Sequence, residues 1–142
     1  MAIDQKICTV FKADLMNTDA NLEANTLKLA LYNDSANLDE TTAAYTTSQE
    51  VSASGSYSAG GATLTSVAIT TSGNTAIFDC GNVSFTNATI SAQAALIYNN
   101  SKANAAIAVL DFGSVKSSSN GTFEIQMPNP TASDGLIRIQ YG

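Results

Sequence analysis

The first residues of the chain carry apolar side chains at helical spacing. These positions are Ile3, Ile7, Val10, Phe11 and Leu15. Steps of three and four residues place them on one stripe of a helix. We therefore expect a short amphipathic helix over Ile3 to Met16, followed by a polar link over residues 17–21. The stripe that holds Val10, Phe11 and Leu15 either caps the core of the domain or docks on a neighbouring subunit. The docking interpretation makes these three residues candidate interface positions.

After residue 25 the apolar period changes from helical to alternating. In Thr26 to Tyr32 the residues Leu27, Leu29 and Leu31 alternate with Lys28, Ala30 and Tyr32, a pattern typical of a strand with one face in the core. Further strands are expected at Glu50–Ala53, Ala62–Thr70, Thr75–Cys80, Asn82–Phe85, Thr89–Tyr98, Ala105–Phe112, Thr122–Met127 and Leu136–Gln140. The predicted core residues are Leu27, Leu29, Leu31, Leu96, Leu110, Phe112, Phe123 and Ile125.

Turn signals separate these runs. They are Gly60-Gly61, Ser72-Gly73-Asn74, Gly81-Asn82, Asn99-Asn100, Asn120-Gly121 and Asp134-Gly135. Glycine adopts positive φ without steric cost, and Asn and Asp tolerate it better than most residues. Strands at this spacing, without long helices to connect parallel neighbours, predict an all-β fold: an antiparallel β-sandwich, jelly-roll-like, with a short N-terminal amphipathic helix. Residues 1–21 form the docking or capping segment and residues 22–142 the β-sandwich domain.

Two polar loops each contain one large side chain. Asn33 to Thr47 carries Tyr45, and Ser52 to Gly61 carries Tyr57 among Ser, Gly and Ala. A tyrosine in a Ser/Gly-rich loop supplies a large rigid contact area at low entropic cost, as in antibody paratopes. Tyr45 and Tyr57 are therefore candidate interface residues. The alternative is a solvated connection whose tyrosine folds back onto the sheets.

The composition argues against catalysis and against a bound cofactor. The chain has no His and no Trp, and histidine is the side chain that exchanges protons near neutral pH without a shifted pKa. Cys8 and Cys80 are too few for a zinc site, and they are expected to be two buried thiols that behave as small hydrophobic groups. The alternative is a disulfide between them, which a reducing compartment disfavours. We predict no catalytic residues, no cofactor and no metal.

The charge of the chain limits its partners. Six Lys and Arg residues against 12 Asp and Glu residues give a net charge of −6, which disfavours the phosphate contacts of nucleic-acid binding and the surface of an anionic membrane. Charged residues make up 13% of the chain, about half of the usual share. Residues 1–14 lack the long apolar stretch of a secretory signal, so folding in a cytoplasm is expected.

The order of short blocks along the chain resembles a family of small virion proteins of tailed bacteriophages. The first half contributes Phe11-Lys12, Thr26 to Tyr32, Ala44-Tyr45-Thr46, Glu50-Val51, and Tyr57 to Gly61. The second half contributes Val83-Ser84-Phe85, Ala88-Thr89-Ile90, Ala94 to Asn99, Ala108 to Gly113, Phe123 to Gln126 and Leu136 to Ile139. The blocks together cover nearly the whole chain.

This resemblance implies a non-enzymatic structural component of the virion that is made in the host cytoplasm. The expected role is a capsid decoration or cement protein that binds the outer surface of the head. Its partners would be the major capsid protein and further copies of itself, as a dimer or trimer. The alternatives are a tail, adaptor or fibre-base protein, a module that recognises host-surface glycan, and a free-standing carbohydrate-binding domain.

Overall fold

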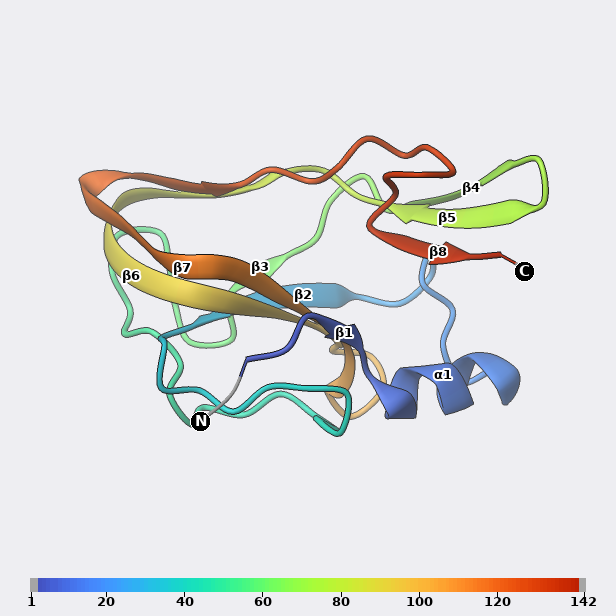
Figure 1. The fold of residues 1–142 in the computed structure, drawn as a ribbon. Coiled ribbons are helices and arrows are strands. Elements are labelled where there is room, and N and C mark those ends of the chain that lie inside the picture. The colour runs from blue at the N-terminus through green and yellow to red at the C-terminus, as the bar shows by residue number, and fades with distance from the viewer. Residues whose placement is uncertain (1–2, 141–142) are drawn as a thin grey trace.

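The computed structural model describes residues 3–140 as two antiparallel sheets and one short helix (Figure 1). The elements are β1 (Lys6–Ile7), α1 (Thr9–Met16), β2 (Leu27–Tyr32), β3 (Ala62–Thr63), β4 (Ala68–Ser72), β5 (Thr75–Asp79), β6 (Val83–Asn99), β7 (Ala105–Ile125) and β8 (Ile137–Ile139). One sheet has the order β1-β7-β6-β2-β3 and the other has the order β4-β5-β8. The expected all-β class with a short N-terminal helix is confirmed. Residues 1, 2, 141 and 142, at the ends of the two expected segments, lie outside the described residues.

One long hairpin, β6 with β7, organises the molecule. Its pairing runs from Val83 opposite Ile125 to Asn99 opposite Ala105. Both strands bend at the same end of the molecule, so that the two halves of the hairpin lie in separate layers (Figure 1). At the bend, β7 uses more residues than β6, and Gly113 has a φ of +84°. Extra residues on one strand of a pair bend that strand, and here they fold the hairpin over the core.

The sequence pattern predicted four separate strands in place of the two strands of this hairpin, and that prediction was wrong. Asn82–Phe85 and Thr89–Tyr98 join in β6, while Ala105–Phe112 and Thr122–Met127 fall largely in β7. Asn120-Gly121 has the chemistry of a turn, and Asn120 does have a positive φ of 45°. It lies at a shift of register inside β7 instead, because a bulge needs the same positive-φ residue that a turn needs.

The core lies between the two layers. Leu27, Leu29 and Leu31 of β2 belong to one buried cluster with Phe85, Ile90, Phe123 and other residues of the opposite layer. The side chains of β2 on the other face, Ala30 and Tyr32, are also buried, in a second cluster with Leu96 and Tyr98. Leu38 and Ala36 belong to this second cluster too, which shows that the chain after β2 covers the outer face of the sheet. The alternation predicted one face of β2 in the core, and the structure buries most of the other face as well.

The N-terminal helix is shorter than its apolar stripe predicts. Only Thr9–Met16 is helical. Ile7 pairs with Ala108 of β7, and Ile3 forms a bridge with Leu38. Strand pairing with distant residues thus replaces the first turns of the expected helix, which is a case of tertiary contacts overriding local pattern.

Several smaller strand predictions also change. Glu50–Ala53 is reduced to a single bridge between Glu50 and Tyr32. Ala62–Thr70 is divided between β3, on the edge of one sheet, and β4, on the edge of the other. Of the eight predicted core residues, Leu110 and Phe112 are only partly buried. These two side chains line an opening beside β7.

Candidate functional site

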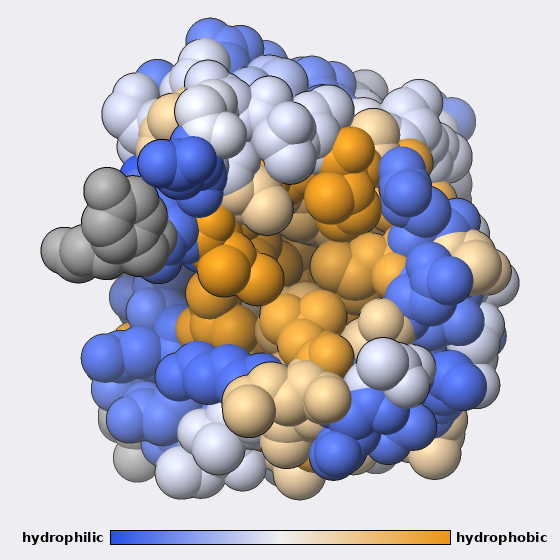
Figure 2. Space-filling view, turned by 90° about the vertical axis from the view of Figure 1, so that its right-hand side faces the viewer, coloured by the Kyte–Doolittle hydropathy of each residue, from blue (hydrophilic) through white to orange (hydrophobic). Residues whose placement is uncertain are grey.

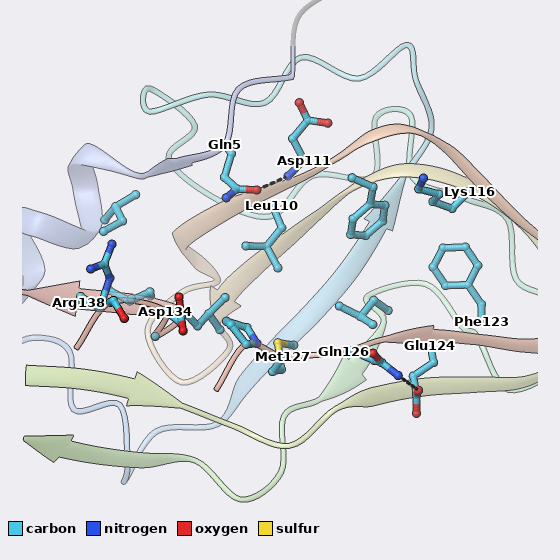
Figure 3. A pocket seen from close by; sticks show the side chains of 18 of the residues that line it. Gln5, Leu110, Asp111, Lys116, Phe123, Glu124, Gln126, Met127, Asp134 and Arg138 are labelled. Atoms are coloured by element: carbon cyan, nitrogen blue, oxygen red, sulfur yellow. Dashed lines mark hydrogen bonds between the residues drawn. The ribbon is translucent and has the colours of Figure 1, made fainter. Parts of the chain in front are cut away.

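An open hollow lies beside β7, on the side of the strand that faces away from β6 (Figure 3). Its volume is about 1000 Å³. The apolar part of its lining consists of Ile7, Leu110, Phe112, Phe123, Ile125, Met127, Leu136 and Ile137. Phe112 and Phe123 lie with their ring centroids 6.3 Å apart. The partial burial of Leu110 and Phe112 follows from this opening, because their side chains border solvent-accessible space.

Polar and charged side chains surround the hollow. They are Gln5, Asp111, Lys116, Glu124, Gln126, Asp134 and Arg138, with several Ser and Thr residues. The carboxylate of Glu124 accepts hydrogen bonds from Ser84 and Gln126. The guanidinium of Arg138 donates to the main-chain oxygen of Ala132 at 2.8 Å. An apolar floor with a polar rim is the usual anatomy of a protein-binding surface.

A second, smaller hollow lies between α1 and the three-stranded sheet. It has a volume of about 370 Å³, and Figure 2 shows apolar side chains gathered at this end of the molecule. Its apolar lining consists of Phe11, Leu15, Ala20, Leu22, Ile69, Ala76, Ile77, Phe78, Ile137 and Ile139. Ile69 is 41% exposed and Ile139 is 56% exposed. Ile137 lines both hollows, so the two openings adjoin at β8.

The three predicted interface residues of the helix have different environments. Phe11 is 2% exposed and belongs to the main core cluster, so it caps the core of the domain itself. Leu15 is partly buried and lines the smaller hollow. Val10 packs against the second cluster, on the other side of the sheet. The structure therefore brings Phe11 and Leu15 together at one opening and separates Val10 from them.

The predicted contact role of Tyr57 is contradicted by its burial. Tyr57 is 1% exposed, and its ring packs edge-on against Phe85 with centroids 4.8 Å apart. Its hydroxyl donates to Glu50 Oε2 at 2.7 Å and accepts from the main-chain N–H of Leu31 at 2.9 Å. The alternative interpretation, in which the loop tyrosine folds back onto the sheets, is the one that the structure shows.

Tyr45 joins the same polar network from the other loop. Its hydroxyl donates to Glu50 Oε1 at 2.7 Å, and its ring stacks on Tyr98 with centroids 4.8 Å apart. The N–H of Gly60 donates to Glu50 Oε2, also at 2.7 Å. One carboxylate thus fastens both loops to the sheet. Sequence reasoning missed Glu50, and the available signal was a single acid within a long Ser/Thr-rich stretch.

Ile69 and Ile139 were also missed. Each lies in a predicted strand. Ile139 lies between Arg138 and Gln140, and Ile69 lies between Ala68 and Thr70, which are patterns that an ordinary core position also shows. Their strands are β4 and β8, the two edges of the small sheet. At an edge the same pattern leaves the side chains exposed, because no neighbouring strand covers them.

The two cysteines are free, buried thiols, as predicted. They lie in different clusters, Cys80 in the main core and Cys8 in the second. Burial raises the pKa of each thiol to about 11. At neutral pH both are protonated and thus poor nucleophiles.

Three acids lie in strands, Asp79 in β5 and Asp111 and Glu124 in β7, and they do not all line the same hollow. Asp111 and Glu124 line the larger hollow, while Asp79 does not. The Asp111 carboxylate accepts the N–H of Gly113 at 2.8 Å. Among residues 3–140, no three His, Cys, Asp or Glu side chains are grouped closely enough to hold a metal ion.

Comparisons with known proteins give no match to a family model, to a curated protein or to a solved structure. The part of the chain that the structure describes contains no helix with the length and apolar character needed to cross a membrane.

Proposed function

We propose that this chain is a non-enzymatic structural protein of a bacteriophage virion, and that it is a capsid decoration protein on the outer surface of the head. It binds the major capsid protein there and stabilises contacts between capsid subunits. The block-by-block resemblance of the sequence to small virion proteins is the origin of this proposal. The finer expectation for the fold, a jelly-roll-like sandwich, stays a prediction.

The observation that carries a binding role is the open apolar end of the molecule. The two adjoining hollows leave Ile69 and Ile139 exposed at the edges of a sheet. Continuous apolar surface with a polar rim marks protein-binding sites on small domains. A decoration protein binds at many symmetry-related positions, so modest contacts at each position suffice when copies associate as a dimer or trimer.

The alternative within the virion is a tail, adaptor or fibre-base position. Copy number separates the two, because a decoration protein occurs in proportion to the major capsid protein and a tail component does not. A role in recognising host glycan through Tyr45 and Tyr57 has less support, since both hydroxyls are engaged by Glu50. A free-standing sugar-binding domain also has less support, because it needs exposed aromatic rings, whereas Tyr57 is buried and the ring of Tyr45 stacks on Tyr98.

Co-sedimentation tests the binding role. Purified protein is mixed with shells of the phage that lack it, and the bound fraction is measured. Ile69→Asp and Ile139→Asp should each weaken binding about tenfold or more, because a charge would enter an apolar contact. The matched control is Thr70→Asp, an exposed position next to Ile69 on β4. Equal binding by all variants, or no binding by the unaltered protein, would contradict the proposal.

A further inference from the structure

We propose that the free edge of β7 is a strand-addition site: an extended segment of the shell protein pairs with this edge and inserts its apolar side chains into the larger hollow. This inference rests on the proposed function for the identity of the partner. The geometry of the edge rests on the structure alone.

The first support is the length of unpaired edge. On the side away from β6, β7 pairs with β1 through Val109 and Ala108, and nearer its start it forms one bridge, between Ala105 and Ala44. Within residues 3–140 no strand continues along that side from Leu110 toward Ile125. An unpaired edge offers a row of main-chain donors and acceptors to another chain.

The second support is the hydrogen bonding of the main-chain N–H groups of β7 just beyond its pairing with β1. The N–H of Asp111 donates to Gln5 Oε1 at 3.0 Å, and the N–H of Gly113 donates to Asp111 Oδ1 at 2.8 Å. The side-chain oxygen of Gln5 therefore bonds the Asp111 donor where the carbonyl oxygen of a neighbouring strand would otherwise do so, and Figure 3 shows this bond. A side-chain oxygen also bonds the Gly113 donor. Both hydrogen bonds are exposed to solvent, so an incoming strand can replace them at little net cost.

The third support is the hollow beside this edge. Leu110, Phe112 and Phe123 lie next to the unpaired backbone and border the opening. Successive side chains of a strand point to opposite faces. A segment paired with β7 would therefore direct every second side chain toward these three residues, and those side chains must be apolar.

Charge defines the other positions of the segment. The rim carries the carboxylates of Asp111, Glu124 and Asp134 against the cations of Lys116 and Arg138, and the whole chain has a net charge of −6. Basic residues on the solvent side of the segment are complementary to this net negative charge. The attraction between the opposite charges also raises the association rate. The segment is thus extended, apolar at alternate positions and basic between them.

Peptide binding tests the edge without altering the protein. The probe is a fluorescein-labelled peptide, Lys-Ile-Lys-Val-Lys-Ile-Lys, titrated with the full chain and followed by anisotropy. The control, Lys-Lys-Ile-Val-Ile-Lys-Lys, has the same composition and charge without the alternation. We expect the control to bind about tenfold more weakly or worse. Equal binding of the two peptides would overturn strand addition.

Methylation of the peptide backbone separates strand pairing from simple apolar contact. One probe carries N-methyl groups on the Ile and Val residues, and the other carries them on the interior Lys residues. In an added strand the main-chain N–H groups of alternate residues point to opposite sides, so either the Ile and Val N–H groups or the Lys N–H groups face β7. The probe that is methylated on the facing N–H groups should lose binding, and the other probe should keep it. If both bind like the parent peptide, the hollow binds apolar groups without pairing and the inference is wrong.

Two protein variants and hydrogen exchange locate the site. Leu110→Glu places a charge at the opening and should abolish peptide binding, whereas Met16→Glu, at an apolar residue that is 88% exposed, should not. Unchanged thermal unfolding shows that each variant is folded. The peptide should slow amide exchange at Asp111 and Gly113 in the unaltered protein. Unchanged exchange at both amides would overturn the site.

Competition on shells separates this inference from the proposed function. Excess unlabelled parent peptide should displace the protein from shells. If the protein binds shells and the peptide neither binds nor competes, strand addition is wrong and the proposed function is retained. If the peptide binds and the protein does not bind shells, the proposed function is wrong, and with it the identity of the segment. Dimerisation that the peptide abolishes would instead identify a second copy of this chain as the occupant and overturn the shell segment.

Discussion

The hydroxyl of Tyr57, a buried residue, lies 2.7 Å from Oε2 of the half-buried Glu50. Glu50 also accepts from Tyr45 and from the N–H of Gly60. The long connection between β2 and β3 is therefore fastened to the sheet by one carboxylate. This arrangement ties both loops to the sheet, and the proposed function assigns contact with partners to the apolar end.

Removing the Tyr57 hydroxyl should destabilise the fold. In Tyr57→Phe, Glu50 loses one donor and the buried N–H of Leu31 loses an acceptor. We expect a loss of about 1–3 kcal/mol in the free energy of unfolding, measured by urea denaturation. Ser58→Ala, at an exposed position next to Tyr57, is the control and should change stability by less than about 0.5 kcal/mol. Equal stability of both variants would show that the network contributes nothing.

Stability should fall at alkaline pH because of the buried tyrosines. Burial raises the pKa of Tyr57 and Tyr32 far above the ordinary value of 10, and for Tyr57 the hydrogen bond to Glu50 adds to the rise. The unfolded chain ionises near pH 10 while the folded chain keeps these protons. Their contribution is therefore complete below pH 10 and is lost as the pH rises above it. Urea midpoints measured across this range should decrease, and less steeply in Tyr57→Phe.

The two thiols should be inert in the native protein. Cys8 and Cys80 are buried, and burial raises the pKa of each to about 11. A disulfide-exchange reagent such as Ellman's reagent should label neither thiol at neutral pH, and both in urea. Rapid labelling of the folded protein would contradict the burial of the cysteine concerned.

The close approach of the second loop to β2 depends on glycine at position 61. Gly61 has a φ of +80°, and a Cβ there would clash with the main-chain oxygen of Leu29. Gly61→Ala should therefore lower the unfolding temperature strongly or prevent folding. Gly73→Ala is the matched control: its φ is +59°, and nothing lies within 4 Å of the added Cβ. It should cost only about 1–2 kcal/mol for the backbone conformation. A similar loss for both variants would show that the close approach is unimportant.

The sequence predicted the parts of this fold that depend on local pattern. The alternation of Leu27, Leu29 and Leu31 correctly gave a strand with those residues in the core. The helical stripe correctly placed Phe11 and Leu15 on one side of a helix, although distant pairing of Ile7 with Ala108 shortened that helix. Such pairing depends on residues far away in the chain, and the hydrophobic periodicity of a short segment cannot predict it.

Most of the candidate site could not be predicted from the sequence, for a similar reason. Leu110 and Phe112 have the pattern of core residues, and they are partly exposed because they border the larger hollow, where no strand of residues 3–140 pairs with β7. Tyr57 lies in a loop with the composition of a contact surface, and its burial depends on where Glu50 and Phe85 are placed. Periodicity determines which side chains share a face, and the tertiary arrangement determines which faces remain open.

A reconstruction of the phage particle at a resolution sufficient to place single domains tests the proposed function most directly. The account predicts this two-layered body on the outer surface of the head, repeated at symmetry-related positions, with the end that carries Ile69 and Ile139 against the shell. A particle in which the protein is absent, or is confined to the tail, would contradict the account.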